Sequence, residues 1–308
     1  VGRCSLVAGK NEDNGTMKVF VTGGTGLIGR ALVKQLVNGG HEVTVLTRQF
    51  RVSESNNRYI QAISSFVERP DVVINLAGAG LADKRWTASY KREIRASRIG
   101  LTELLVAHLR VIGCLDVFRM GSACGFCGVS DDQQFDVSFV PGQGFSADLC
   151  RDWEASVEPM SASDTRYVFL RTGVVLDRLA GAYPKMTQSF KFGMGSWMGK
   201  GEQWLSWIHL DDMVGGIIHC MASPGLTGPV NLTAPQPVTH RAFSAEIARH
   251  RRPLLSLGLP APIMRLALGE MADYLLLTGQ RVVPTKLLAA EFSFAYPTIR
   301  AAASALEV

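Results

Sequence analysis

The twelve residues Lys18-Val-Phe-Val-Thr-Gly-Gly-Thr-Gly-Leu-Ile-Gly29 decide the fold of this chain. The first five, KVFVT, are rich in β-branched and aromatic side chains and predict a buried strand that ends directly in a glycine turn. From Leu27 to Asn38 apolar residues recur at four-residue spacing, which predicts a helix that stops at Gly39. A second strand is expected over residues 42–47, EVTVLT, so this stretch is predicted to be a βαβ unit.

The glycine turn has the spacing that suits the pyrophosphate of a dinucleotide. Gly23 permits the tight turn, Gly26 lets the backbone approach the phosphates, and Gly29 lets the helix and strand pack closely. The N-terminus of the following helix offers free N–H groups and the positive end of its dipole. The expected cofactor contacts in this turn are Gly23, Thr25, Gly26, Leu27, Ile28 and Gly29.

The residues after the second strand favour NADP over NAD. A site for NAD needs an acidic side chain there, which accepts a hydrogen bond from the ribose 2′-hydroxyl. This chain has Thr47-Arg48 instead, and a guanidinium can bind a 2′-phosphate through two hydrogen bonds. The alternative is that Arg48 is a solvated loop residue. We expect NADP(H) as the cofactor, with Arg48 at the 2′-phosphate.

Strands and helices continue to alternate along the chain. Further strands are expected at 72–76, 115–120 and 167–176, with one placed loosely near 59–62, and helices at about 90–110 and 148–160. This alternation predicts an α/β fold of the Rossmann type, in which helices cover both faces of a doubly wound parallel sheet.

The sequence pattern changes after residue 176, and we expect a second, smaller lobe there. Glycine, methionine and aromatic residues dominate 181–201, and short helical patterns predominate from residue 253. We predict an NADP-binding domain over 17–176 and a mostly helical C-terminal substrate lobe over 177–308, including a small helical extra domain at 253–300. Residues 229–234 are candidates to return to the main sheet.

Composition narrows the class of partner. The net charge of +5 comes from scattered Lys and Arg, whereas a nucleic-acid-binding protein typically carries a concentrated basic stripe. No run of about 18 uncharged apolar residues is present, so we expect no membrane span. The six cysteines do not show the regular spacing of a disulfide framework, which favours reduced thiols in a cytoplasmic protein. We also expect no metal site, and a protein that is a monomer or a homodimer. Residues 1–16 are polar, and we interpret them as a leader or tag outside the fold.

Several motifs occur in an order typical of one family. After VTGGTGLIG come NLAG at 75–78, KRW at 84–86, RTGVVL at 171–176, WIHLDDM at 207–213 and GQRVVP at 279–284. This set resembles the epimerase-like branch of the extended short-chain dehydrogenases/reductases, including the small DUF1731-type C-terminal domain of that branch. The resemblance implies a C-terminal lobe that closes over a small-molecule substrate. It also implies cofactor contacts from Asn75, Leu76, Ala77, Gly78 and Arg171.

The catalytic residues implied by the resemblance are only partly present. Ser122 stands where the family has its catalytic Ser or Thr, at the carboxyl end of a strand. The family's Tyr-x-x-x-Lys falls on Ser146 and Cys150, and neither side chain supplies a phenol or a cation. His209 is a further candidate, although its alternative role is to anchor a loop by hydrogen bonds.

These residues leave two hypotheses for function. One is an NADP-dependent oxidoreductase or epimerase that acts on a hydroxyl or carbonyl of a small, sugar-like substrate. The other is a non-catalytic sensor that binds NADP(H), which the missing Tyr and Lys favour. An open polar cavity with an ionisable side chain near Ser122 would support the enzyme, and a filled apolar one would support the sensor.

Overall fold

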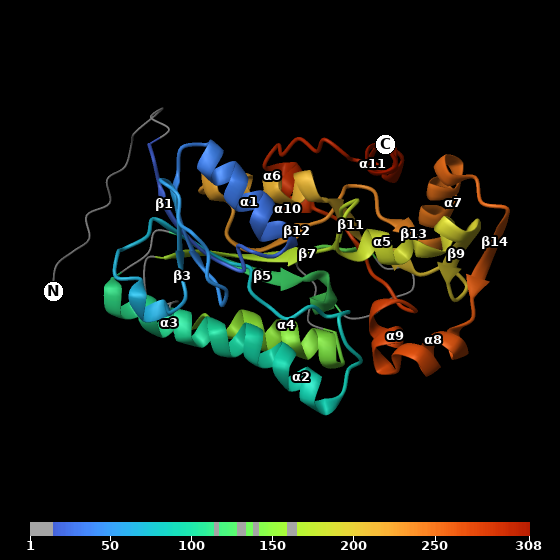
Figure 1. The fold of residues 1–308 in the computed structure, drawn as a ribbon, viewed down its shortest axis with the longest axis horizontal. Coiled ribbons are helices and arrows are strands. Elements are labelled where there is room, and N and C mark those ends of the chain that lie inside the picture. The colour runs from blue at the N-terminus through green and yellow to red at the C-terminus, as the bar shows by residue number, and fades with distance from the viewer. Residues whose placement is uncertain (1–14, 114–116, 128–133, 138–141, 159–164) are drawn as a thin grey trace.

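A parallel sheet of seven strands forms the centre of the molecule (Figure 1). The computed structural model describes residues 15–113, 117–127, 134–137, 142–158 and 165–308, so most of the expected leader at 1–16 lies outside the described residues. The strand order is β12-β7-β5-β4-β1-β2-β3. The strands are β1 (Lys18–Thr22), β2 (Glu42–Leu46), β3 (Asn57–Ile60), β4 (Val72–Asn75), β5 (Val117–Ala123), β7 (Arg166–Thr172) and β12 (Gly228–Leu232). Because β1 lies between β2 and β4, the winding direction reverses there, which places a crevice at the carboxyl ends of β1 and β4.

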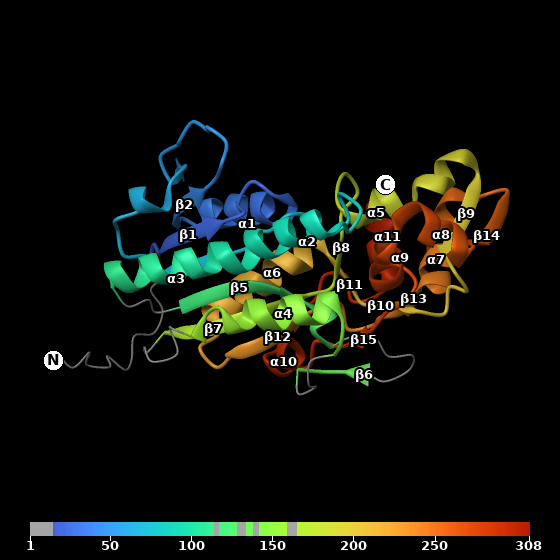
Figure 2. The ribbon, with the colours of Figure 1, turned by 90° about the horizontal axis from the view of Figure 1, so that it is seen from below.

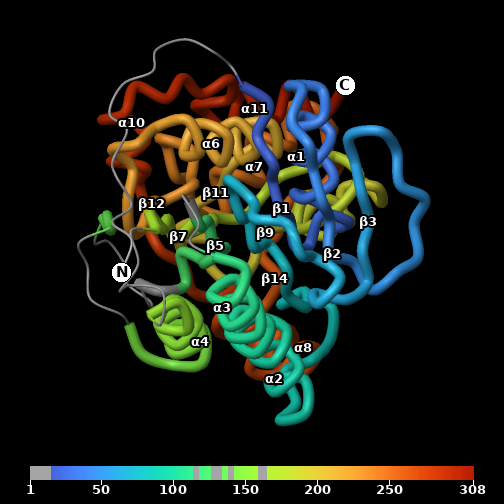
Figure 3. The backbone as a smooth tube through the Cα atoms, turned by 90° about the vertical axis from the view of Figure 1, so that its left-hand side faces the viewer, coloured from blue at the N-terminus to red at the C-terminus, as the bar shows by residue number. Residues whose placement is uncertain are grey.

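Helices cover both faces of this sheet, as the sequence predicts. Figures 1 and 3 show α1 (Leu27–Asn38) and α6 (Leu210–Ala222) on one face, and α2 (Ala88–Arg95), α3 (Leu101–Ile112) and α4 (Phe145–Ala155) on the other. Leu32 of α1 and Ile217 of α6 are fully buried in one apolar cluster with strand residues. On the opposite face Leu105 and Trp153 pack in a second cluster. The sheet domain therefore includes α6 and β12, which lie beyond the predicted domain boundary at residue 176.

The C-terminal elements form a smaller lobe at one end of the sheet (Figure 2). It contains α5 (Ala182–Met186), α7 (His240–Arg251), α8 (Ala261–Leu268), α9 (Glu270–Leu275) and α11 (Ile299–Leu306), whereas Leu287 of α10 (Thr285–Ala289) packs in the sheet-domain cluster. Two-stranded sheets join β9 (Met194–Met198) to β14 (Leu255–Leu259), β10 (Trp204–Leu205) to β13 (Val238–Thr239), and β6 (Gln134–Phe135) to β15 (Arg281–Val282). Short 3₁₀ turns occur at η1 (Ile63–Ser65), η3 (Cys124–Cys127) and η5 (Gln188–Phe192). In the described part of the chain no helix has both the length and the apolar character needed to cross a membrane.

The expected strand at 167–176 is the clearest error of the sequence analysis. The chain leaves the main sheet at Gly173, and Val174–Leu176 forms a separate strand, β8, which pairs with β11 (Trp207–His209). A Cβ atom at Gly173 would lie 2.7 Å from the carbonyl oxygen of Ser206, so only glycine allows the close passage there. By contrast, β12 pairs in parallel with β7, which places most of 229–234 in the main sheet as expected.

Candidate active site

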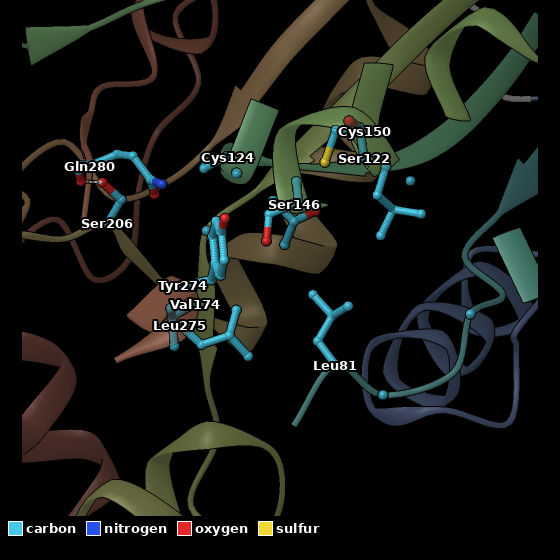
Figure 4. Close-up of a pocket in the computed structure, with 18 of the residues that line it drawn as sticks. Leu81, Ser122, Cys124, Ser146, Cys150, Val174, Ser206, Tyr274, Leu275 and Gln280 are labelled. Carbon is cyan, nitrogen blue, oxygen red and sulfur yellow. Dashed lines mark hydrogen bonds between the residues drawn. The ribbon is translucent and has the colours of Figure 1, made fainter. Parts of the chain in front are cut away.

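A single cavity of about 520 Å³ connects the two parts of the molecule (Figure 4). Its wall includes the glycine turn, the carboxyl end of β5, one side of α4, the β7–β8 junction and residues 204–206 and 274–280. Figure 4 shows Ser122, Ser146 and Cys150 around the same space as Tyr274 and Gln280. The sheet domain and the C-terminal lobe therefore both contribute side chains to one site.

The glycine turn has the geometry that a dinucleotide requires. Gly23 has a φ of +72°, and a Cβ atom there would lie 2.6 Å from the carbonyl carbon of Leu76. A Cβ atom on Gly29 would lie 2.2 Å from the carbonyl oxygen of Gly23, so the helix packs directly on the turn. Gly26 lines the cavity, and no side chain of the described residues caps the N-terminus of α1. These features fit a pyrophosphate on exposed backbone N–H groups.

The predicted cofactor residues lie in different surroundings. Five of the six in the glycine turn line the cavity, as do Leu76 and Gly78, whereas Thr25 and Ala77 lie outside its wall. Asn75 is buried, accepts a 2.5 Å hydrogen bond from Thr22 Oγ1 and donates a 2.8 Å one to Thr102 Oγ1, so it joins β1, β4 and α3. Arg48 is exposed directly after β2, outside the cavity wall.

Ser122 is held by a buried ion pair that the motifs do not indicate. Its hydroxyl donates a 2.7 Å hydrogen bond to Oε1 of Glu154. Arg171 binds the same carboxylate twice, from Nε to Oε1 and from Nη2 to Oε2, both at 2.9 Å. Arg171 does not line the cavity, and it orients Ser122 through Glu154. Since the Ser122 proton is directed at Glu154, the oxygen lone pairs remain for a ligand.

Ser146 and Cys150 both line the cavity from α4. Burial raises the pKa of the Cys150 thiol to about 12, so this thiol stays protonated near neutral pH. The Ser146 hydroxyl oxygen is buried and has no hydrogen-bond partner among the described residues. Cys150 is thus a packing residue at the cavity wall, whereas Ser146 has an unused donor and acceptor.

His209 lies outside the cavity wall. Its Nδ1 accepts a 3.2 Å hydrogen bond from the backbone N–H of Asp211 and so caps α6, while its ring contacts Tyr296 with a centroid distance of 3.9 Å. Burial lowers the pKa of the imidazole. The structure therefore places His209 in the role of a loop anchor.

Three ionisable residues of the cavity wall were not found from the sequence: Arg98, His240 and Tyr274. Arg98 lies on a π-helical turn (Ala96–Gly100) between α2 and α3, donates from Nη1 to the Ala79 carbonyl at 2.9 Å, and lies 5.3 Å above the Trp153 ring. Burial lowers the pKa of the His240 imidazole to about 4. No motif marks these residues, although π-helical turns are frequent at functional sites.

Two family profiles match the chain. One, described as NAD dependent epimerase/dehydratase family, matches residues 19–231, and the other, described as a domain of unknown function (DUF1731), matches residues 259–306. The second match includes α9 and therefore Tyr274.

Similar proteins extend over nearly the whole chain. Epimerase family protein Mb2239 of Mycobacterium bovis is 37% identical over 285 residues, which cover 91% of this chain and 94% of that protein. Epimerase family protein YfhF of Bacillus subtilis is 36% identical and covers 94% of this chain and 98% of its own length. The crystal structure of human epimerase family protein SDR39U1 (isoform 2), determined with NADPH, superposes with a TM-score of 0.88 at 28% identity, over 94% of this chain and 99% of that one.

Proposed function

Because the chain belongs to the NAD-dependent epimerase/dehydratase family, we propose that it is an NADP(H)-dependent oxidoreductase or epimerase. Its substrate would carry the reacting hydroxyl or carbonyl on a small, sugar-like molecule. One observation carries this proposal: a single cavity runs from the glycine turn past Ser122 to the C-terminal lobe. A cofactor and a substrate can therefore meet in one cavity.

The residues of this chain divide the binding of NADP(H) between them. The backbone at Gly26, Leu27 and Ile28 would hold the pyrophosphate at the N-terminus of α1, and the Arg48 guanidinium would bind the 2′-phosphate after β2. When bound, the nicotinamide supplies or accepts a hydride at the substrate carbon. Ser122, fixed by Glu154, would accept a hydrogen bond from the substrate hydroxyl.

The open space beside Ser122 favours an enzyme over a sensor, although most of the cavity wall is apolar rather than polar. A protein that only senses NADP(H) does not need an empty space beside Ser122. Apolar side chains could fill that space without affecting cofactor binding. Here Ser122 shares the cavity wall with the unpartnered Ser146 hydroxyl and with ionisable side chains that include Arg98. We also propose that the protein is cytoplasmic, that it is a monomer or homodimer, and that its binding partner is a small molecule.

Titration of the purified protein with NADPH and NADH, followed by calorimetry, tests the cofactor assignment. We expect the wild type to bind NADPH more tightly than NADH. Loss of a charge-assisted contact of about 1.5–3 kcal/mol in Arg48→Ala would weaken NADPH binding about 10- to 150-fold and leave NADH binding unchanged. Arg249→Ala, on α7, is the matched control. Equal binding of both cofactors by the wild type would contradict the assignment to NADP(H).

A further inference from the structure

The proposed function requires a group that exchanges a proton with the substrate oxygen. At the two positions where the family motif would place Tyr and Lys, α4 carries Ser146 and Cys150. Cys150 holds its proton too tightly to serve near neutral pH, since burial raises its pKa to about 12. A serine hydroxyl forms hydrogen bonds but is too weak an acid to replace a phenol. The proton donor must therefore come from another element.

The described residues of the cavity wall offer five ionisable side chains: Arg98, Cys124, Cys150, His240 and Tyr274. An arginine keeps its proton near neutral pH, and the Cys124 thiol already donates to the Arg171 carbonyl at 3.4 Å. His240 is neutral there, because burial lowers its pKa to about 4, so it has no acidic imidazolium proton to give. Tyr274 remains, and tyrosine is an established type of general acid and base.

The position of Tyr274 matches the gap in α4. Its ring stacks on Trp86 with a centroid distance of 5.8 Å and an interplanar angle of 27°, which fixes the direction of the side chain. A Cβ atom on Gly144, the residue before α4, would lie 2.6 Å from the Tyr274 oxygen. Gly144 has a φ of +95°, so a glycine both permits the turn and leaves room for the phenol. The phenol of the C-terminal lobe thus reaches the first turn of α4.

Two hydroxyls without protein partners belong to the wall of the cavity in this region. Figure 4 shows Tyr274 pointing towards Ser146, which follows Gly144 by two residues. Within the described residues neither hydroxyl has a hydrogen-bond partner. Buried polar groups are normally paired, so the buried and unpaired Ser146 hydroxyl indicates a polar ligand atom at this point of the cavity, where the half-buried Tyr274 also forms part of the wall.

We propose that Tyr274 is the catalytic proton donor and acceptor at the substrate oxygen, with Ser146 as the second hydrogen-bond partner of that oxygen. In the reductive direction the Tyr274 hydroxyl would give its proton to the carbonyl oxygen, and NADPH, when bound, would supply the hydride that the carbonyl carbon requires. The phenolic O–H bond breaks, its electron pair stays on the Tyr274 oxygen, and water restores the proton. The products are the alcohol and NADP⁺. Arg98 is the one permanent charge on the described wall of the cavity.

Reduction of 9,10-phenanthrenequinone by NADPH, followed at 340 nm, is the first test of this role. Tyr274→Phe keeps the ring that stacks on Trp86 and removes only the hydroxyl. We expect it to lower kcat about 100-fold or more while the NADPH Kd stays within about twofold. The control is Tyr59→Phe in β3, whose hydroxyl accepts a hydrogen bond from Asn57 and does not line the cavity. Full turnover by Tyr274→Phe would overturn the role of Tyr274.

A second measurement decides the question if the wild type does not reduce this quinone. In protein labelled with ¹³Cζ-tyrosine, the Tyr274 resonance is identified by its absence from Tyr274→Phe. We expect NADP⁺ to lower the pH midpoint of that resonance, because the positive nicotinamide favours the phenolate. An unchanged midpoint would overturn the proposal. The other ionisable side chains of the cavity wall are the same in the samples with and without NADP⁺: Arg98, Cys124, Cys150 and His240. The inference rests on the proposed function, so failure of the wild type to bind NADPH overturns both, whereas binding with an insensitive Tyr274 overturns only this inference.

Discussion

At the scale of the single residue, close packing makes Gly29 irreplaceable. A Cβ atom there would lie 2.2 Å from the Gly23 oxygen and 2.6 Å from the Cα of Gly24, both backbone atoms that cannot move without opening the turn. We predict that Gly29→Ala destabilises the fold by about 1–3 kcal/mol and abolishes NADPH binding. Gly100→Ala is the control, since a Cβ there meets nothing within 4 Å, and it should leave the melting temperature unchanged or slightly higher. A normal melting temperature and normal NADPH affinity in Gly29→Ala would contradict this account of the turn.

His240 predicts a dependence of stability on pH. Burial lowers its pKa to about 4, against about 6.5 in the unfolded chain. Between pH 6.5 and pH 4 the imidazole is protonated in the unfolded state but not in the folded state. The free energy of unfolding is therefore highest above pH 6.5 and decreases as the pH falls towards 4. From this residue alone we expect a loss of about 2 kcal/mol between pH 7.5 and pH 5.

Urea unfolding at these two pH values checks the prediction for His240. His240→Gln should remove most of the pH-dependent loss. His250→Gln, an exposed histidine on the same helix, should keep it. Identical pH dependence in wild type and His240→Gln would show that the imidazole is not shielded from water in the folded state.

The residues that the sequence analysis found are those whose role depends on near neighbours in the chain. Gly23, Gly26 and Gly29 are recognisable because the turn, the helix and the strand that need them lie within thirty residues. Tyr274 comes from a segment about 130 residues after Ser146, and no spacing rule links the two. Arg171 was expected at the cofactor but pairs with Glu154, because its direction in β7 depends on where α4 packs.

At the scale of the elements, the Glu154–Arg171 pair fastens α4 to β7 behind Ser122. Little of either side chain is exposed, 10% of Glu154 and 3% of Arg171. Removing one partner leaves the other charge buried without its counter-ion, which typically costs about 3–5 kcal/mol. We predict that Glu154→Gln loses that much stability in urea and that Glu154→Gln combined with Arg171→Met loses less. A loss below about 1 kcal/mol in Glu154→Gln would mean that α4 is held in place by its apolar contacts alone.

Elements were predictable from the sequence where one pattern dominated. The βαβ unit from β1 to β2 is confirmed almost to the residue, because strand, turn and helix signals agree there. The long helix expected at 90–110 is interrupted by a π-helical turn that its apolar periodicity does not reveal. The strand expected at 167–176 divides at Gly173 because Ser206, from a distant segment, passes beside it. Such contacts are tertiary, and the local secondary-structure propensity of the sequence does not predict them.

At the scale of the whole molecule, function depends on the two lobes sharing one space. The sheet domain provides the glycine turn, Ser122 and Ser146, and the C-terminal lobe provides His240 and Tyr274. Both lobes and the cofactor turn are predictable from the sequence, but the cavity forms only where residues 274–280 lie against α4 and the β7–β8 junction. This arrangement is what the proposed enzyme requires, since a substrate must lie between the cofactor and the lobe that covers it.

The decisive measurement for the shared cavity is a crystal structure of the full chain with NADPH. We expect the pyrophosphate on the backbone of Gly26 to Ile28 and the 2′-phosphate against Arg48. The nicotinamide should lie inside the cavity next to Ser122, with free space left towards Tyr274. An NADPH molecule whose nicotinamide lies outside the cavity, or a cavity that the side chains of the C-terminal lobe fill once NADPH is bound, would contradict it.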